Sequence, residues 1–197
     1  MTKVQMLDKL VCNNNGYLVV ADGIDLGISK SYVLEYAHTN TMEKVARGIY
    51  ITKDTWCDDM YVIHLNNKGI IFSHESALAM YGMIENEPTS INITVNRSYN
   101  ASHLRKKGCK VYTVSPELYN LGVAETETLY GNKVPAYDME RTLCDIIKHK
   151  NDIEIQNYRS AVREYMQSKQ KNLLNLMRYA KALGVEKRVR TYTEVML

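Results

Sequence analysis

The sequence predicts an α+β protein in two domains: an N-terminal module of helices with a β-hairpin, and a C-terminal mixed domain with a small sheet and several helices. Three observations support this fold class. Residues 1–52 alternate between helical and β-prone segments, residues 91–137 hold short alternating runs, and residues 139–183 carry patterns of helical period. A length of 197 residues is sufficient for two small domains, each with its own core.

The N-terminal segment predicts a helix, a short strand and a second helix. Apolar residues recur at helical spacing over residues 2–13, and the Asn-Asn-Asn-Gly run that ends at Gly16 stops this helix. Tyr17–Val20 is β-prone. The next run, Ala21–Leu26, has room for two turns of helix before Gly27.

A third helix and a hairpin follow. Ser29 is a good N-cap residue for a helix over Lys30–Thr39. Two strand-like runs, residues 42–46 and 49–52, are separated by Arg47-Gly48, which predicts a hairpin with glycine at its turn. This order of elements is that of a winged helix-turn-helix, in which the second helix of the pair enters the major groove of DNA. A plain packing unit of helices and a hairpin is the alternative.

The third helix has an apolar side and a polar side when its residues are placed at about 100° steps. Val33, Tyr36 and Ala37 share the apolar side. We expect the other side to read DNA, with simple exposure to solvent as the alternative, because its groups can hydrogen-bond to base edges or phosphates. These groups, including the first turn, are Ser29, Lys30, Ser31, Tyr32, Glu35, His38 and Thr39.

The predicted hairpin carries two cations, Lys44 before its turn and Arg47 within it. A cation in such a wing can lie along the DNA backbone or enter the minor groove. The alternative is that these charges keep the edge of the hairpin soluble. We favour contact with phosphates.

Beyond the hairpin, the pattern is less regular. Residues 85–90, which include Pro88, are the best candidate for a boundary, giving a winged helix-turn-helix domain over residues 1–85 and a second domain over 86–197. The predicted strands are residues 61–65, 91–95, 110–114, 129–130 and 134–137, and the predicted helices are 74–83, 139–149, 153–167 and 171–183.

Charge is distributed unevenly along the chain, although the formal net charge is only +3. Residues 1–100 carry 8 basic and 11 acidic side chains, whereas residues 101–197 carry 17 basic and 11 acidic ones. A basic second half can attract DNA phosphates at long range, and solvated helix faces are the alternative. The candidate phosphate contacts are Arg105, Lys106, Lys107, Arg159, Arg163, Arg188 and Arg190.

Motifs of catalysis and of metal or cofactor binding are not found in the sequence. It has no GxxxxGK[ST], GxGxxG or GxSxG pattern, and its five histidines are isolated from one another. No lysine has an acidic residue two positions before it, an arrangement common in metal-dependent nucleases. We therefore expect a protein that is not an enzyme and that uses no cofactor or metal. A nuclease with another order of ligands is the alternative.

One dense polar cluster lies between residues 138 and 145. Asp138 is placed to cap a helix, and Glu140 lies in the first turn, where a negative charge is favoured. Arg141 can pair with Asp145 one turn further on. A structural role is favoured over a catalytic dyad.

The sequence also bears on localisation. No N-terminal stretch resembles a signal peptide, and no run approaches the roughly 18 apolar residues that span a membrane. The four cysteines are widely spaced along the chain. These observations predict a cytoplasmic protein with reduced thiols and no membrane partner.

Several stretches resemble a known family. Gly27-Ile28-Ser29 and Val45–Tyr50 are similar to the winged-helix domain of the AbiE-type abortive-infection antitoxins of bacteria. Ser73–Leu78 and Pro135–Asp145 resemble two other stretches typical of that family, in the same order along the chain. Met139 stands where family members often have proline, which makes the helix start less rigid.

The resemblance implies a function in phage defence. Such an antitoxin belongs to a type IV toxin–antitoxin system and represses its own operon by binding inverted repeats in promoter DNA. It also counters a toxin that resembles a nucleotidyltransferase, without a stable direct complex. The alternative is a transcriptional regulator, or a protein that binds the toxin directly, without separate antitoxin activity.

Overall fold

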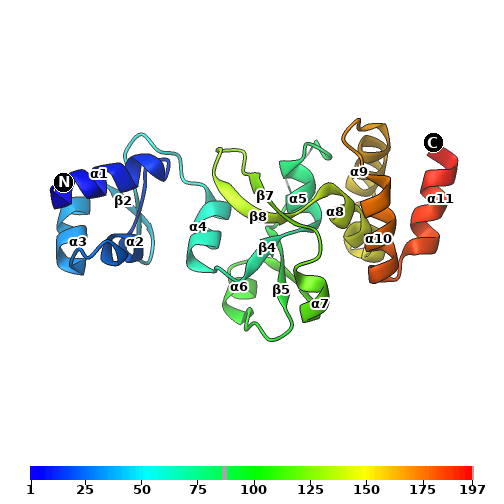
Figure 1. The fold of residues 1–197 in the computed structure, drawn as a ribbon, viewed down its shortest axis with the longest axis horizontal. Coiled ribbons are helices and arrows are strands. Elements are labelled where there is room, and N and C mark those ends of the chain that lie inside the picture. Colours follow the sequence, from blue (N-terminus) through cyan, green and yellow to red (C-terminus); the bar gives the residue numbers. More distant parts are fainter. Residues whose placement is uncertain (86–87, 197) are drawn as a thin grey trace. The chain divides into compact units, whose positions relative to one another are not determined.

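The computed structural model describes residues 1–85 and 88–196 (Figure 1). The chain folds into two compact units, each with its own β-sheet. The first unit comprises Met1–Lys68 together with Tyr130–Asn132, and the second comprises Gly69–Leu129 and the chain from Lys133 onward. The α+β class expected from the sequence is confirmed. Across the described ranges, no helix combines the length and the apolar character needed to cross a membrane.

The first unit combines helices with a small antiparallel sheet. Its described elements are α1 (Lys3–Asn13), β1 (Tyr17–Val19), α2 (Val20–Asp25), α3 (Lys30–Thr39), β2 (Glu43–Ala46), β3 (Ile49–Ile51) and α4 (Asp59–Asn66). The strands have the order β1-β3-β2. Tyr17 and Glu43 both lie opposite Ile51 of the central strand. Gly48, with a φ of +74°, makes the predicted hairpin turn.

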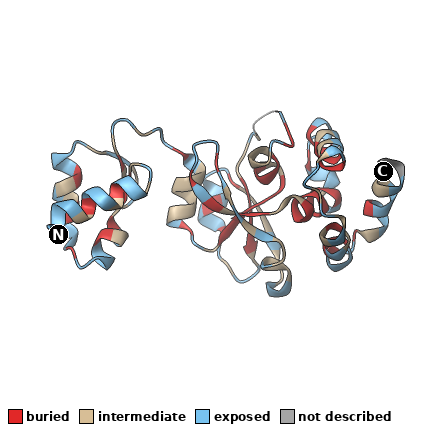
Figure 2. Ribbon diagram, turned by 45° about the horizontal axis from the view of Figure 1, so that its top comes forward, coloured by how far each residue is buried: buried red, intermediate tan, exposed pale blue. Residues whose placement is uncertain are grey.

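The helices of the first unit pack through a small apolar core (Figure 2). Leu7 of α1 and Val33 of α3 are fully buried in it, as the helical spacing of the sequence predicts. A capping box starts α1, because the Thr2 hydroxyl accepts a hydrogen bond from the Gln5 N–H and the Gln5 side chain accepts one from the Thr2 N–H.

Gly23 allows α2 and α3 to approach each other closely. A Cβ atom at this position would lie 2.8 Å from Cγ2 of Val33, which is closer than side-chain carbons pack. Gly27, which follows α2, has a φ of +78° and turns the chain toward α3. The two helices are therefore joined by a compact turn, as the sequence predicts.

Residues 61–65, predicted to be a strand, lie in the helix α4, so this prediction is wrong. The run is β-prone in composition, but the Asp58 carboxylate accepts a hydrogen bond from the Tyr61 N–H at 3.0 Å and caps a helix. Helical spacing then packs Tyr61 and Leu65 against the buried residues of the small sheet.

The short segment Tyr130–Asn132, distant in sequence from the rest, completes the first unit. Within this segment, Asn132 donates a hydrogen bond from Nδ2 to Oδ2 of Asp58 at 2.8 Å. Its own Oδ1 accepts one from Asn15 Nδ2 at 3.0 Å. The residue that caps α4 is thus held by residue 132 as well as by its own helix.

The second unit is built on a five-stranded sheet of order β6-β5-β4-β8-β7. Its central strand is antiparallel to one neighbour, residues 92–96, and parallel to the other, residues 133–137. The main core lies among the helices, where Leu143, Tyr165 and Leu176 are fully buried. The described elements are β4 (Ile70–Phe72), α5 (His74–Met80), β5 (Asn92–Asn96), α6 (Ser102–Lys106), β6 (Lys110–Val114), α7 (Pro116–Tyr119), β7 (Val123–Glu127), β8 (Lys133–Tyr137), α8 (Met139–Lys148), the 3-10 helix η1 (Lys150–Asp152), α9 (Ile155–Gln167), α10 (Leu173–Leu183) and α11 (Glu186–Met196).

The structure corrects several expectations for this unit. The predicted strand at Leu129–Tyr130 lies in the turn between β7 and β8. The strand in this region is β7, at the edge of the sheet, where alternating half-buried residues give only a weak apolar signal. The sequence also does not predict β4, α7 or α11, which are short or largely polar. α5 ends at Met80, before the predicted Met83, because Gly82 takes a left-handed conformation.

The division between the units falls between Lys68 and Gly69, earlier than the predicted boundary at residues 85–86. β4 and α5 belong to the second unit, because β4 pairs with β5 and β8, and α5 packs on α8. The predicted boundary stretch includes residues 86 and 87, which lie outside the described residues.

Candidate nucleic-acid interface

α3 buries one side and exposes the other. Val33 and Ala37 are 0% and 1% exposed and belong to the core of the first unit. This confirms the apolar side expected from the sequence. The opposite side is exposed and carries Ser29, Lys30, Ser31, Glu35, His38 and Thr39.

Ser29 occupies the N-cap position of α3, as predicted, with an extended backbone (φ −63°, ψ 143°). Among the described residues, its side chain makes no capping hydrogen bond. The first turn of α3 includes Lys30 and has no acidic residue. The partial positive charge of the helix N-terminus and the lysine charge therefore add to each other and favour a phosphate nearby.

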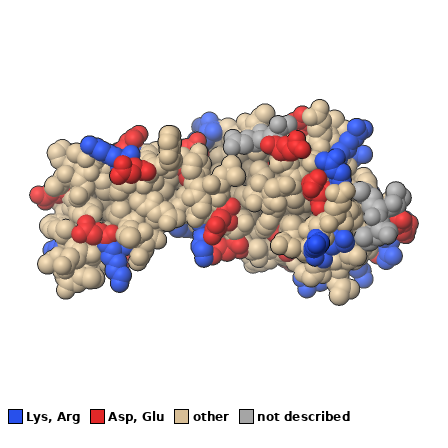
Figure 3. All heavy atoms as spheres, turned by 90° about the horizontal axis from the view of Figure 1, so that it is seen from above, with Lys and Arg blue, Asp and Glu red and all other residues tan. Residues whose placement is uncertain are grey.

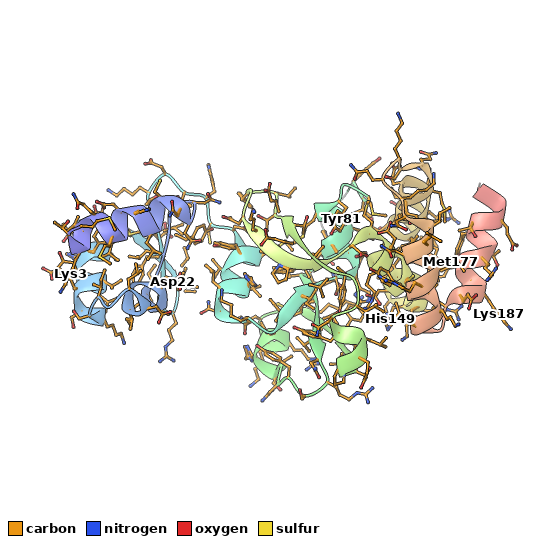
Figure 4. All side chains as sticks on the ribbon, in the orientation of Figure 1. Lys3, Asp22, Tyr81, His149, Met177 and Lys187 are labelled. Carbon is orange, nitrogen blue, oxygen red and sulfur yellow. The ribbon has the colours of Figure 1, made fainter. Side chains whose placement is uncertain are left out.

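Tyr32 is half-buried, in contrast to its neighbours on this face. Its ring packs against the apolar core of the first unit. The ammonium group of Lys3, labelled in Figure 4, lies 5.4 Å from the centroid of the ring. Packing thus accounts for much of this side chain, and contact of its hydroxyl with DNA stays a prediction.

Tyr36 fixes α3 to α1. Its hydroxyl donates a hydrogen bond to Oδ1 of Asp8 at 2.6 Å. Burial and this acidic partner raise the pKa of the Tyr36 phenol, so the hydroxyl keeps its proton and the bond persists at neutral pH. The exposed face of α3 is therefore held in a defined orientation within the unit.

The hairpin places its two predicted cations in solvent. Lys44 lies on β2, opposite Tyr50 of β3, and Arg47 lies in the turn. The register shifts between Lys44 and Ala46, which is the mark of a β-bulge and increases the local twist. Both side chains are exposed and accessible to a phosphate backbone.

The basic residues suggested for the second unit are exposed but lie on different elements. Figure 1 shows α6 and α11 at opposite ends of this unit, and Figure 3 shows Lys and Arg gathered over the end with the C-terminal helices. Because α6 and α11 are far apart, the suggested basic residues do not form a single surface. Arg105, Lys106 and Lys107 lie on or just after α6, Arg159 and Arg163 on α9, and Arg188 and Arg190 on α11.

Three of these arginines already contact groups of the second unit. Arg163 Nε lies 3.2 Å from Oε1 of Glu164, and Arg190 Nη2 lies 2.8 Å from Oε1 of Glu186. Arg188 Nη1 donates a hydrogen bond to the carbonyl of Ile147 at 3.2 Å. The exposed ion pairs of Arg163 and Arg190 are weak and exchange readily, so they leave these two arginines available to a partner.

The polar cluster between residues 138 and 145 is built into the core. Asp138 Oδ1 accepts a hydrogen bond from the Arg141 N–H at 2.8 Å, which is the predicted cap of α8. The predicted pair also forms, with Arg141 Nε 3.1 Å from Asp145 Oδ2 and side chains 0% and 3% exposed. Arg141 Nη1 donates to the carbonyls of Leu118 and Leu121 at 2.7 Å each. This burial favours a structural role over a catalytic dyad.

Sequence reasoning missed a contact between the buried His74 and the half-buried His149. His74 Nε2 and His149 Nδ1 lie 3.1 Å apart, and His74 Nδ1 lies 2.9 Å from Ser73 Oγ. The ring of His74 stacks on Tyr112, with centroids 3.4 Å apart. His74 also adopts a φ of +50°, which is uncommon for a residue with a side chain. Each histidine is isolated along the chain, so no spacing in the sequence indicates this contact.

Burial lowers the pKa of His74 well below its ordinary value, and the positive charges of His149, Lys110 and Arg141 act in the same direction. The folded protein therefore keeps this imidazole neutral. An unfolded chain titrates histidine near pH 6.5, so below that pH it binds more protons than the folded chain. The folded protein therefore loses stability as the pH falls below about 6.5.

We expect the second unit to lose stability between pH 7 and pH 5, by up to about 1.4 kcal/mol per pH unit from this one proton. The replacement His74→Gln should flatten the dependence, because glutamine does not titrate. Hydrogen exchange of α5 and β5 peptides measures the second unit separately. This is necessary because burial also lowers the pKa of His64 in the first unit, to about 4. Equal pH slopes in the two proteins would contradict the assignment to His74.

The described residues contain no group of three or more His, Cys, Asp or Glu side chains placed to hold a metal ion. Comparison with known proteins gives no match to a family model or to a curated protein sequence. The fold is similar to that of the RV2827C protein from Mycobacterium tuberculosis, known from a crystal structure. That likeness has a TM-score of 0.58 and 10% sequence identity, and covers 89% of this chain and 70% of that chain.

Proposed function

We propose that this protein is a DNA-binding antitoxin of a type IV abortive-infection system and that it represses its own operon. In this proposal, the first unit acts as a winged helix-turn-helix, with α3 in the major groove and the β2–β3 hairpin on the flanking backbone. The observation that carries the proposal is the exposed polar face of α3, on a helix whose other side is fixed in the core.

Rigid support of α3 favours recognition of base edges. A reading helix must hold its side chains within hydrogen-bond distance of the bases, and a mobile helix would lose this precision. Close packing at Gly23 holds α3 against α2, and the hydrogen bond from Tyr36 to Asp8 holds it against α1. Support of this kind is expected of a recognition helix and is not needed in a helix that is merely exposed.

The proposed contacts divide by chemistry. Lys30, Lys44 and Arg47 contact phosphates, which sets affinity and orientation. Ser31 and His38 can donate to or accept from base edges, and Glu35 can accept from the amine of cytosine. The basic residues of α6, α9 and α11 extend the contact with the backbone.

The antitoxin role rests on the resemblance to the AbiE-type family. The stretch Ser73–Leu78 forms the start of α5, and Pro135–Asp145 runs from β8 into α8. In the second unit these stretches pack together, with Leu78 and Leu143 in the same core. The resemblance thus concerns residues that build this unit. The proposed partner is a nucleotidyltransferase-like toxin that is countered without a stable complex.

We expect the double replacement Lys30→Ala with Arg47→Ala to weaken binding to the DNA upstream of the gene at least tenfold. The plot of log affinity against log salt should become shallower by about one for each lost phosphate contact. Fluorescence anisotropy with the full-length protein at several salt concentrations measures both quantities.

Lys9→Ala is the matched control for this experiment, because Lys9 is an exposed cation of α1, outside the proposed interface. Its affinity and salt dependence should equal those of the unmodified protein. Unchanged binding by the double variant would show that α3 and the hairpin are not the interface.

Co-expression with the toxin gene distinguishes the two forms of antitoxin. The proposal expects growth to be restored and the two proteins to elute separately in size-exclusion chromatography. Co-elution at a fixed ratio would favour the alternative of a protein that binds the toxin directly.

A further inference from the structure

The second unit contains a pocket of about 450 Å³ among the end of α8, η1, α9 and α11. This volume lies in the range of small-molecule sites, roughly 300–1,000 Å³. His149 lines the pocket at the end of α8, and Lys187 marks the first turn of α11 on the same side of the unit (Figure 4). All of the residues that line the pocket belong to the second unit.

The lining of the pocket is strongly basic. Lys148, Lys150 and Arg188 all face it, and its described lining residues include no carboxylate. Of the nearby acids, Glu186 is paired with Arg190, and Asp145 is paired with Arg141. Asp152 of η1 is exposed and adds one carboxylate next to the lining residue Asn151. One cation at the end of α8 would be explained by the helix dipole, but three around a cavity create a positive potential that an anion relieves.

Arg188 is positioned for a phosphate group. Its Nη1 donates a hydrogen bond to the carbonyl of Ile147 at 3.2 Å, which fixes the guanidinium at the pocket. This bond uses one of its five N–H donors. The remaining donors form the planar fork that binds phosphate oxygens in pairs.

Two tyrosines meet beside the pocket. The hydroxyls of Tyr158 and Tyr192 are hydrogen-bonded at 2.6 Å and join α9 to α11. Their rings are 6.2 Å apart at an interplanar angle of 63°. Tyr158 is only 4% exposed and packs in the core, so the half-buried ring of Tyr192 supplies the accessible aromatic surface. The ammonium of Lys150 lies 5.1 Å from the centroid of the Tyr158 ring. A planar base stacks favourably on such rings.

His149 adds a ring nitrogen to the lining. Its Nδ1 lies 3.1 Å from both His74 Nε2 and the carbonyl oxygen of Asp145. These contacts fix the ring and leave Nε2 as the nitrogen that can serve a ligand. The pocket thus combines fixed cations, a polar ring nitrogen and aromatic surface.

We propose that this pocket binds a mononucleotide. Its phosphates contact Lys148, Lys150 and Arg188, and its base lies against the ring of Tyr192. The inference goes beyond DNA binding by the first unit and does not depend on it.

Isothermal titration calorimetry of the full-length protein, without DNA, tests the proposal. ATP and GTP are the probes, and adenosine and pyrophosphate represent the separate halves of the ligand. We expect at least one nucleotide to bind with saturation and both fragments to bind at least tenfold more weakly. Arg188→Gln should weaken nucleotide binding at least tenfold. Arg190→Gln, on the same helix and outside the pocket lining, should leave it unchanged.

Circular dichroism melting of each variant confirms that it is folded, and Lys148→Gln replaces Arg188→Gln if the latter unfolds. No binding of ATP or GTP at millimolar concentration would overturn the proposal. Equal affinity for pyrophosphate and for the nucleotides would overturn the role of Tyr192. Loss of operator affinity in Arg188→Gln, in a protein that binds no nucleotide, would leave Arg188 with its proposed contact to the DNA backbone alone.

Discussion

Replacing Asp145 with leucine is expected to lower the free energy of unfolding of the second unit by about 3–5 kcal/mol. The carboxylate is the counter-charge of Arg141, whose side chain is 0% exposed. Without it, a guanidinium that does not lose its proton stays in the core with no opposite charge. The loss exceeds the value of the pair itself, because most of it is the cost of the unpaired charge.

Urea titration, monitored by the hydrogen exchange of α8 peptides, measures this loss in the second unit. Glu186→Leu is the matched control, since Glu186 and Arg190 have the same four-residue spacing but side chains 37% and 59% exposed. That change should cost less than about 1 kcal/mol. Similar losses in the two variants would mean that the buried pair contributes no more than a surface pair.

The double variant Arg141→Met with Asp145→Leu should recover part of the stability lost by Asp145→Leu alone. It removes the buried charge, but it also removes the donor that serves the carbonyls of Leu118 and Leu121. Recovery is therefore expected to be incomplete. A double variant less stable than Asp145→Leu would show that the two carbonyl contacts outweigh the charge.

Gly122→Ala is expected to destabilise the second unit by about 3 kcal/mol, through strain and overpacking together. Gly122 has a φ of +78°, and an added Cβ would lie 2.6 Å from Cβ of Arg141 and 3.2 Å from Cε2 of Tyr179. Neither neighbour can move freely, because Arg141 is buried in its ion pair and the Tyr179 hydroxyl donates to Asp138 Oδ2 at 3.0 Å.

Gly108→Ala separates the two contributions. Gly108 lies in the same unit with a φ of +86°, but a Cβ there would meet no atom within 4 Å. Only the backbone strain remains, about 1 kcal/mol. Thermal melting of both variants compares them directly. Equal shifts in Tm would show that contact with Arg141 contributes nothing at Gly122.

Local signals predict much of the first unit and the start of α8. The capping role of Asp138 and the pairing of Arg141 with Asp145 follow from spacing along a single helix, so the sequence contains them. The buried side of α3 follows in the same way from the positions of Val33 and Ala37. Each of these features depends on residues fewer than ten positions apart.

Features that join distant segments were not predictable in this way. Tyr61 lies in a β-prone run, and only the cap at Asp58 and packing on the sheet make it helical. His74 meets His149 across 75 positions, and the pocket at Arg188 needs the turn after α8 to meet α11. A single sequence shows which residues can pair, but it does not show which distant partners the fold selects.

The first unit is discontinuous in sequence, and this has a consequence for synthesis on the ribosome. Asp58 receives its hydrogen bond from Asn132 only after that residue has left the exit tunnel. By then the nascent chain already contains β4, β5 and β6, so the first unit is completed during, and not before, the growth of its neighbour. A fragment that ends at residue 85 would repeat the unfinished intermediate of translation, with the cap of α4 still lacking this partner.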